Sequence, residues 1–582
     1  MNPLAFLERR VQAALETLQA EGFLPPDIAL PRAAVEPPRD PAHGDLSTNA
    51  ALVLAKPARR PPIAIAEALA ERLRSVPEIE VASAAKPGFV NFRMAPSFWQ
   101  RQVPAVLEAG DAYGRADMGQ GIKVNVEFCS ANPTGSLHVG HARGTVFGDA
   151  LASLLDHAGY DVTREYYIND GGAQIEALAR SIHHRYLEAL GRAPGPMPGG
   201  LYPLKELVPV AEAIAARDGA VWAEAPEADW LRLFGDEAVA AMMDRIRDDL
   251  LAVGVRHDAF VSERALVEAG RIETTLALLE DKGLVYEGVL PPPKGKPVED
   301  YEPVPQLLFR STAYGDDSDR PLKRSNGAWT YVAADLAYHL DKIERGFDQL
   351  IDVLGADHGG YVKRMAAGVA ALSDGRVGFD AKLCQLVSLL DAGQPLKMSK
   401  RAGRIVTMRD VVDEVGKDAF RFIMLTRKND AGLDFDLQKV VEQSKDNPVF
   451  YVQYAHARVC SVFRNLEAEG AGELGTNLAD APVALLTDPA ELALIRQTAL
   501  FPRLVEAAAA AHEPHRVAFY LHDLAAAFHA LWTRGKEEPA LRFIRTDEPD
   551  LTRARLAMLA AVRRTIALGL GLMGVTPVSE LT

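Results

Sequence analysis

The chain has very little cysteine. Its 582 residues include only Cys129, Cys384 and Cys460, which lie far apart. Three isolated thiols exclude a disulfide framework and a cysteine-based zinc site. Long apolar runs are lacking as well, since no stretch reaches the roughly 20 residues that span a bilayer. The N-terminus also lacks the charged-then-apolar layout of a secretion signal. We therefore expect a cytoplasmic chain with no membrane contact.

Basic residues are too few for an extended nucleic-acid surface. The 64 lysines and arginines are outnumbered by 79 acids, which gives a net charge of -15. Proteins that bind nucleic acids usually show a basic face, so any RNA contact should be confined to a few surfaces and depend strongly on salt. The composition, 48% hydrophobic and 25% charged, is that of an ordinary soluble protein. The length predicts several domains.

The segment 123–149, KVNVEFCSANPTGSLHVGHARGTVFGD, has the pattern of a strand, a loop and a helix. Alternating apolar residues up to Phe128 indicate a buried strand, and the next residues include Asn, Pro, Thr and Gly, which favour a loop. Apolar residues then recur at helical spacing, so a helix should begin at His138. A helix N-terminus has unpaired N–H groups and the positive end of the dipole. We predict that it binds an anion, with Gly140 allowing close approach.

Two groups of basic residues, far apart in the chain, suggest one binding site. His138 and His141 are three residues apart, so both lie on one face of the first helical turn and could donate to the anion. The alternative is that they cap the helix or fill a polar gap. Far downstream lies LKMSKRAGR, 396–404, with four cations. Taken alone, such a run is usually a solvated loop.

Together the two elements resemble the HIGH and KMSK signatures of class I aminoacyl-tRNA synthetases, and the second matches letter for letter. The longer context, SANPTGSLHVGHARG followed by YYINDGGAQIE, is similar to arginyl-tRNA synthetases in particular. This resemblance implies an arginine–tRNA ligase. ATP with Mg²⁺ would activate L-arginine as an adenylate and release pyrophosphate, and the arginyl group would then pass to the 3′ end of tRNA(Arg). No prosthetic group or protein-bound metal is expected, and we expect a monomer.

Strands and helices alternate from residue 123 onward, which predicts an α/β fold with a doubly wound, Rossmann-like parallel sheet. Ligands bind beyond the carboxyl ends of such strands, where the loop after residue 128, the segment 355–360 and the lysine-rich run should all lie. An insertion, about 173–327, interrupts the alternation. The strands expected in the sheet are 123–128, 161–168, 328–332, 349–354 and 383–390.

Four regions are expected along the chain. The resemblance makes residues 1–110, a small α/β unit, a domain that binds the tRNA elbow. Residues 111–390 would be the catalytic domain, 391–440 a connective region with the KMSK loop, and 441–582 an all-helical anticodon-binding bundle. The last ten residues, MGVTPVSELT, are expected to extend past where most family members stop. The helices expected in the bundle are 447–468, 488–511, 514–533 and 549–572.

The resemblance also assigns roles to single residues. A guanidinium offers five donors in a rigid fork, so its pocket needs carboxylates around it. Without the resemblance, Glu127 would be interpreted as a solvated strand end and Asp335 as a helix cap. The implied catalytic residues are His138, His141, Lys397 and Lys400. The implied ATP-binding residues are Gly140, His138, His141, His358, Met398 and Lys400. The implied arginine-binding residues are Glu127, Asn132, Tyr331 and Asp335.

The resemblance also implies contacts with tRNA in the two outer regions. Phe89 and Asn91 could stack on and hydrogen-bond a flipped-out base, although Phe89 could equally belong to the core. In the bundle, Tyr454 and Arg458 belong to an aromatic stripe that is either core or an RNA contact. The arginines considered as phosphate contacts on the last helix are Arg553, Arg555, Arg563 and Arg564.

Other classes of protein fit the pattern less well. Small nucleotidyltransferases also begin a helix with histidine-glycine-histidine, but they would leave the helical bundle unexplained. An RNA-binding relic of a synthetase would need its signatures lost, and both are intact. A cysteinyl enzyme should show thiol-rich zinc spacing, and a glutamyl enzyme needs cations where this chain has acids.

Overall fold

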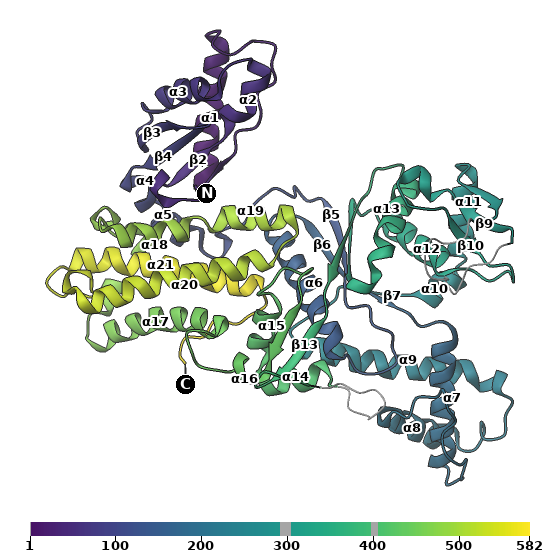
Figure 1. The fold of residues 1–582 in the computed structure, drawn as a ribbon. Coiled ribbons are helices and arrows are strands. Elements are labelled where there is room, and N and C mark those ends of the chain that lie inside the picture. Colours follow the sequence, from purple (N-terminus) through teal and green to yellow (C-terminus); the bar gives the residue numbers. More distant parts are fainter. Residues whose placement is uncertain (1, 291–303, 397–405, 582) are drawn as a thin grey trace. The chain divides into compact units, whose positions relative to one another are not determined.

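The chain folds into two compact units, which are considered separately (Figure 1). The computed structural model describes residues 2–290, 304–396 and 406–581, so the predicted site residues Lys397, Met398 and Lys400 lie outside the described part. One unit comprises residues 1–116, 443–572 and 576–582, and the other comprises 117–442 and 573–575. No helix of the described residues is long and apolar enough to cross a membrane.

A five-stranded parallel sheet forms the centre of the second unit. Its spatial order is β12-β11-β5-β6-β7. In chain order the first strand, β5, lies in the middle, and the direction of winding reverses between β5 and β11. The doubly wound prediction is confirmed, and that reversal marks the crevice where such folds bind ligands. The strands are β5 (Lys123–Glu127), β6 (Asp161–Ile168), β7 (Ala259–Ser262), β11 (Gln349–Gly355) and β12 (Gly378–Cys384).

Two of the predicted strands were wrong. Residues 328–332 do not form a strand, because helix α12 (Tyr331–Glu344) begins within them. Residues 383–390 contain the end of β12 and the start of β13 (Val387–Asp391), which pairs with β14 (Gln394–Pro395) and β15 (Leu433–Asp436) in a separate sheet. Both segments are short apolar runs. The periodicity of such a run does not distinguish a strand from a helix, and it does not show where one strand ends and the next begins.

The predicted insertion is divided by a strand of the main sheet, β7. Before it lies a helical module with its own core, which includes Tyr186, Trp230 and Phe234. After it lies a small antiparallel sheet of β10, β9 and β8 with two helices. The elements are α7 (Gly172–Ala189), α8 (Val208–Asp218), α9 (Glu227–Ala252), α10 (Glu263–Glu268), α11 (Arg271–Asp281), β8 (Val285–Gly288), β9 (Gln306–Phe309) and β10 (Arg320–Lys323).

Helices α6, α12 and α13 connect strands of the main sheet. Three short helices of the same unit, α14, α15 and α16, follow residue 406. Helix α6 follows β5, α12 precedes β11, and α13 links β11 to β12. Their bounds, with the later helices, are α6 (Val139–His157), α13 (Gly359–Ser373), α14 (Met408–Val415), α15 (Lys417–Met424) and α16 (Leu437–Val440).

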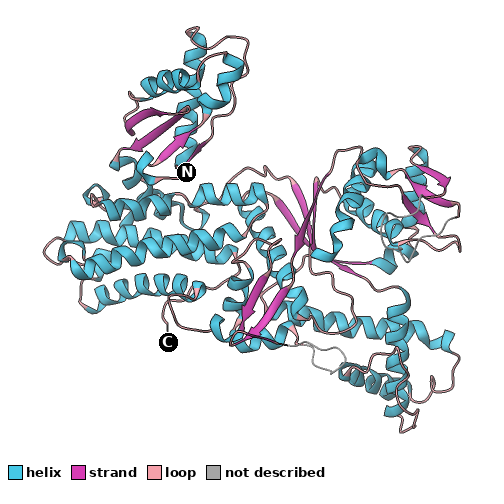
Figure 2. Cartoon of the chain, in the orientation of Figure 1, coloured by secondary structure: helices cyan, strands magenta, loops and turns pink. Residues whose placement is uncertain are grey.

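The first unit combines a small antiparallel sheet with a helical bundle (Figure 2). Tyr113 donates to the carbonyl of Thr498 at 3.0 Å, and Arg496 forms an ion pair with Asp45, so the N-terminal and C-terminal segments pack together. The N-cap residue of the second helix is Asn49. The sheet comprises β1 (Val35–Glu36), β2 (Leu46–Thr48), β4 (Phe89–Met94) and β3 (Ile79–Ala85).

The helices of the bundle lie close to their predicted positions. The expected run 488–511 divides at Leu500 into two helices, and the other three runs in the bundle are single helices. The helices of the whole unit are α1 (Pro3–Ala20), α2 (Ala50–Ala58), α3 (Pro62–Leu73), α4 (Pro96–Gln100), α5 (Gln102–Ala109), α17 (Pro448–Ala468), α18 (Pro489–Ala499), α19 (Phe501–Ala511), α20 (His515–Glu537) and α21 (Pro549–Leu572).

A buried arginine links several parts of the second unit. Arg421 donates to the carbonyls of Met573 and Val253 and forms an ion pair with Asp149 of α6 at 2.5 Å. Gly574 has a φ of 66° and lies against the guanidinium, so a Cβ atom there would be 2.3 Å from Cζ of Arg421.

We predict that Gly574→Ala lowers the free energy of unfolding by about 2 kcal/mol or more, because it combines a positive φ with overpacking. Thermal and urea unfolding would measure this. Gly571→Ala is the matched control, since a Cβ at this exposed position meets nothing within 4 Å. Equal stability of the two variants would contradict the packing argument.

Candidate active site

The two histidines form the N-terminus of α6. His138 is the N-cap residue: its Nδ1 accepts from the N–H of Gly140 at 3.0 Å, and Nδ1 of His141 accepts from the N–H of His138 at 3.3 Å. The rings stack with their centroids 3.8 Å apart. The sequence had posed capping and ligand binding as alternatives, and in this geometry Nδ1 of each ring caps the helix while Nε2 belongs to the opposite edge.

These hydrogen bonds determine the protonation of the rings. A nitrogen that accepts from a backbone N–H carries no hydrogen, so the proton of a neutral ring is on Nε2. Burial, and then the neighbouring His138, lower the pKa of His141 to about 4. His141 is therefore neutral at pH 7, and its Nε2–H can donate to an anion without a positive charge.

The backbone of the first turn differs from the prediction. The N–H of Val139 donates to the carbonyl of Val406 at 3.4 Å, and the N–H of His141 donates to the carbonyl of His138 at 2.9 Å. Together with the bond from Gly140, all three amides at the start of α6 have protein acceptors. An anion at this helix end would therefore meet the imidazole donors rather than unpaired amides.

The chain that follows the lysine-rich run lies beside the histidines. Thr407 forms an isolated antiparallel bridge with His138, and the N–H of Met408 donates to the carbonyl of Leu137 at 2.7 Å. The described residue nearest the run on this side, Val406, is thus in contact with the start of α6. The described flank of the lysine-rich run therefore lies against the start of α6.

A strained turn follows β5. Cys129 and Ser130 have φ angles of 71° and 33°, which non-glycine residues rarely adopt. In this turn the hydroxyl of Ser130 donates to Glu127 at 3.0 Å and accepts from the N–H of Tyr167 at 3.1 Å. Beyond it, the exposed Asn132 donates to Gln174 at 2.9 Å.

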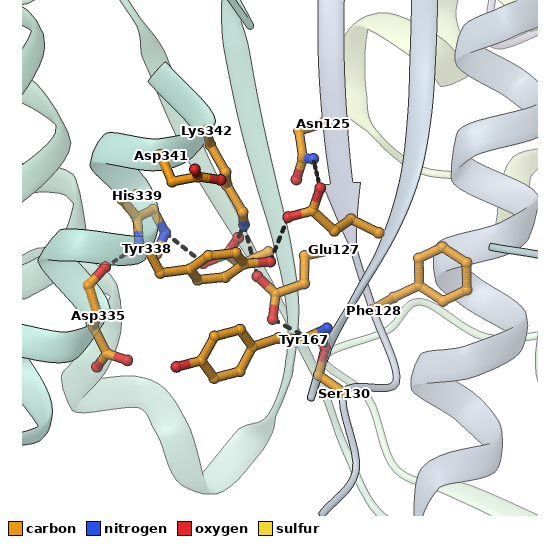
Figure 3. Close-up of polar contacts among 12 residues, drawn as sticks. Asn125, Glu127, Phe128, Ser130, Tyr167, Asp335, Tyr338, His339, Asp341 and Lys342 are labelled. Atoms are coloured by element: carbon orange, nitrogen blue, oxygen red, sulfur yellow. Dashed lines mark hydrogen bonds and ion pairs between the residues drawn. The ribbon is translucent and has the colours of Figure 1, made fainter. Parts of the chain in front are cut away.

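Glu127 already has a cation partner (Figure 3). Its Oε2 lies 2.6 Å from Nζ of Lys342, and its Oε1 accepts from Ser130. Lys342 is fully buried and is also 3.2 Å from Asp352. Sequence reasoning placed Glu127 at the end of a strand, but the lysine that pairs with it comes from α12, 215 positions later.

Asp335 lies one helical turn after Tyr331 on the same side of α12. Figure 3 shows its carboxylate directed away from Lys342, on the same side as the hydroxyl of Tyr167. Burial raises the pKa of Asp335 to about 7, and the carboxylates of Glu127 and other nearby acids add to this rise against the opposing effect of His339. Tyr331 is 73% exposed. No ion pair joins Asp335 to a described residue.

The sequence interpretation missed a further acid, Glu263. It is the first residue of α10, directly after β7, and it accepts a hydrogen bond from Tyr167. Burial raises its pKa, and no ion pair joins it to a described residue. The signal was present in AFVSE, an apolar stretch followed by an acid, but β7 was hidden within the expected insertion.

His358 lies in the short 3₁₀ turn Ala356–His358 that follows β11. Its Nε2 is 3.7 Å from the carboxylate of Asp357, and both side chains are more than half exposed. The position agrees with the predicted rim, because the turn begins where β11 ends, beside the point at which the winding reverses.

The predicted tRNA contacts lie in the first unit. Phe89 is partly exposed, whereas Asn91 is buried in β4. The guanidinium of Arg458 lies 3.9 Å from the ring centroid of Tyr454, donates to its hydroxyl at 2.8 Å and faces His529.

All four arginines considered on α21 have partners within the unit, and Arg553 donates to the carbonyl of Asn477 at 3.3 Å. Arg555 is buried in an ion pair with Glu491 at 2.6 Å, and Arg564 pairs with Asp111 at 2.5 Å. Arg563 lies over the ring of Phe463. Arg555 in particular is closed to a phosphate, because its guanidinium has no solvent face.

Known family models match the chain in three regions. The arginyl tRNA synthetase N terminal domain matches residues 5–94, the class I (R) tRNA synthetase catalytic domain matches 102–194, and the DALR anticodon binding domain matches 452–581.

Curated relatives match over their whole length. The arginine–tRNA ligase of Parvibaculum lavamentivorans is 58% identical over 585 residues, and that of Cereibacter sphaeroides is 58% identical over 581, with 100% of each chain covered. The expectation that the C-terminus outlasts the family was therefore wrong for these relatives.

A solved arginyl-tRNA synthetase from Thermus thermophilus has the same fold, with a TM-score of 0.71, 23% identity, and 99% of this chain and 100% of that chain covered. The identities over full length, with the catalytic-domain match, establish what the chain does. The chain belongs to the arginyl-tRNA synthetases and, as a class I enzyme, attaches arginine to tRNA(Arg) with ATP.

Proposed function

We propose that the carboxyl edge of the parallel sheet forms arginyl-adenylate and then transfers the arginyl group to the tRNA 3′ end. One observation carries this proposal: the histidine pair, the acids Glu127, Asp335 and Glu263, and the turn at His358 all belong to segments at that edge. The arginine carboxylate attacks the α-phosphorus of ATP, and the bond to pyrophosphate breaks. The carboxylate is already an anion at neutral pH, so the enzyme aligns the reactants and stabilises charge.

In this proposal the Nε2–H groups of His138 and His141 donate to the phosphates of ATP. Being neutral, His141 contributes a hydrogen bond without charge, and positive charge comes from Lys397 and Lys400. The contact of Val406 with the start of α6 supports an approach of that run to the same phosphates. Gly140, His358 and Met398 would complete the ATP site. Magnesium would enter with ATP, as the counter-cation of its phosphates.

Arginine would be selected by acids that lack a cation of their own. Among the described residues, Asp335 and Glu263 meet that condition, and Tyr167 and Tyr331 would border the guanidinium or its stem. Glu127, held by Lys342 and Ser130, retains lone pairs that could accept from the substrate, as could the carbonyl of Asn132. Lysine or citrulline would leave these partly buried acids unpaired, which gives discrimination of about 10⁴-fold without an editing site.

The first unit would hold the tRNA. We assign the tRNA elbow to residues 1–110, with Phe89 as the more accessible contact, and the anticodon to the bundle 441–582, where Tyr454 and Arg458 form an aromatic–cation pair. The residues between would comprise the catalytic domain, 111–390, and the connective region, 391–440. We further propose a cytoplasmic monomer.

The reaction can be tested by amino-acid-dependent exchange of pyrophosphate into ATP. All twenty amino acids would be measured with and without total tRNA. We expect exchange with arginine alone, and the comparison shows whether bound tRNA is needed. Equally efficient pyrophosphate exchange with another amino acid would contradict the proposed arginine pocket.

We predict that His141→Ala slows arginine activation about a hundredfold, because one well-placed donor contributes roughly 3 kcal/mol to the transition state. Loss of the cap bond should cost only about 1 kcal/mol of stability. His141→Gln is the matched control, since the glutamine amide can donate from about the position of Nε2 and should recover part of the rate.

Lys400→Ala should slow activation to a similar degree. Unchanged exchange rates in both alanine variants would remove these residues from the mechanism.

We predict that Asp335→Asn raises the KM for arginine at least a hundredfold while the KM for ATP stays unchanged, because the loss removes a buried charge-assisted hydrogen bond of about 3 kcal/mol. Steady-state aminoacylation with each substrate varied in turn would measure both constants. Asp357→Asn, which changes an exposed carboxylate on the same rim, is the control. Equal arginine KM values in the two variants would place the pocket elsewhere.

The raised pKa of Asp335 predicts a pH dependence. With a pKa of about 7 the carboxyl group is mostly protonated at pH 6, so kcat/KM for arginine should fall roughly tenfold between pH 8 and pH 6. The ionised form of Asp335 is the one that binds arginine, so affinity for arginine is present above the pKa of Asp335 and is lost below it. In Asp335→Asn this dependence should disappear, and a retained fall would assign it to another group.

A further inference from the structure

Three acids lie in one row across the buried face of the sheet. Asp352 of β11 is directly opposite Glu127 of β5, and Glu127 is directly opposite Glu165 of β6. Residues in register on parallel strands point to the same face of the sheet. All three are buried, so their mutual repulsion is poorly screened. This face requires cations from another element.

Helix α12 supplies those cations at a spacing of three residues. His339 contacts Asp352 at 3.1 Å, and Lys342 lies between Glu127 at 2.6 Å and Asp352 at 3.2 Å. The three cations share one face of the helix because of that spacing. The last of them, Arg345, makes two bonds to Glu165, at 2.6 and 2.8 Å. The row of acids and the row of cations together are called the ion ladder below.

His339 connects the ion ladder to the proposed arginine site. Its Nε2 faces the carboxylate of Asp352, and its Nδ1 lies 2.7 Å from the backbone carbonyl of Asp335. Both partners are acceptors, so both ring nitrogens donate and the ring is an imidazolium. Burial opposes that charge, but Asp352 outweighs it and raises the pKa of His339. Lys342 is likewise charged, because the three acids outweigh its burial and raise its pKa.

The cations of the ion ladder neutralise the three acids of the ladder, and none of them forms an ion pair with Asp335. Counting charges, His339, Lys342 and Arg345 balance Asp352, Glu127 and Glu165. Asp335, one turn before His339, has no ion pair with a described residue. Buried ion pairs are weak evidence for stability, because apolar replacements of similar volume are often neutral or stabilising. A charged face here therefore favours a role in positioning.

We propose that Asp352, His339 and Lys342 are positioning residues for arginine recognition: they hold α12 at one height above the sheet and orient the turn that presents Asp335. None of the three touches the substrate in this arrangement, since each is buried. The inference rests on the proposed contact of Asp335 with arginine. It adds that this contact depends on the three buried residues of the ion ladder, which do not touch arginine themselves. Figure 3 shows His339 and Lys342 on one side of α12, with Asp335 beyond them.

Asp352→Asn tests this proposal in the full-length enzyme. The change keeps the shape, removes the counter-ion of His339 and leaves the bond between Lys342 and Glu127. We expect the KM for arginine to rise roughly tenfold or more, because a small displacement of a binding group is costly. The KM for ATP should stay unchanged, which a general loss of folding would not produce. If Asp352→Asn does not fold, His339→Gln replaces it, since glutamine can donate to Asp352 but releases the carbonyl of Asp335.

Lys382→Met is the matched control. It removes an ion pair with Asp380, 2.8 Å long, on β12 of the same sheet, away from the row of acids. We expect wild-type KM values for this variant. The proposal would be overturned if a folded Asp352→Asn or His339→Gln variant kept the wild-type KM for arginine. It would also be overturned if the KM for arginine and the KM for ATP rose together. Should Asp335→Asn raise the arginine KM while these variants do not, only the ion ladder inference fails and the arginine site stands.

Discussion

The architecture of the second unit depends on neutralising three carboxylates placed side by side in a buried sheet. Asp352, Glu127 and Glu165 occupy neighbouring strands in register, where like charges repel. Helix α12 answers with cations at every third position, so it can lie over that face in only one register. The helix that carries Tyr331 and Asp335 is thereby fixed by electrostatics as well as by its apolar contacts.

The start of α6 follows a different principle. Its first amides are satisfied within the chain: His138 is the N-cap residue, and Nδ1 of each imidazole accepts a hydrogen bond from a backbone N–H at the start of the helix. Each ring thus serves the fold through Nδ1, and the proposal assigns the donation to ATP to Nε2. Because burial keeps His141 neutral, its Nε2–H is a hydrogen-bond donor without a positive charge.

Sequence reasoning succeeded where periodicity and local chemistry agree. The strand 161–168 and the helices of the bundle lie where they were expected, because long patterns of one period leave few alternatives. It failed at 328–332 and 383–390, short apolar runs that suit either a helix or a strand. Glu263 was missed for a related reason: its strand, β7, is four residues long and lies between two insertions.

The order of residues was sufficient to predict the family and the parallel sheet, since both depend on patterns of residues close together in the chain. It could not show that Glu127 pairs with Lys342, that Asp352 stands opposite Glu127, or that Asp335 has no ion pair with a described residue. Those facts depend on which distant segments meet in a low-dielectric interior. There, a carboxylate is a ligand site or a structural ion according to whether the fold brings a cation to it.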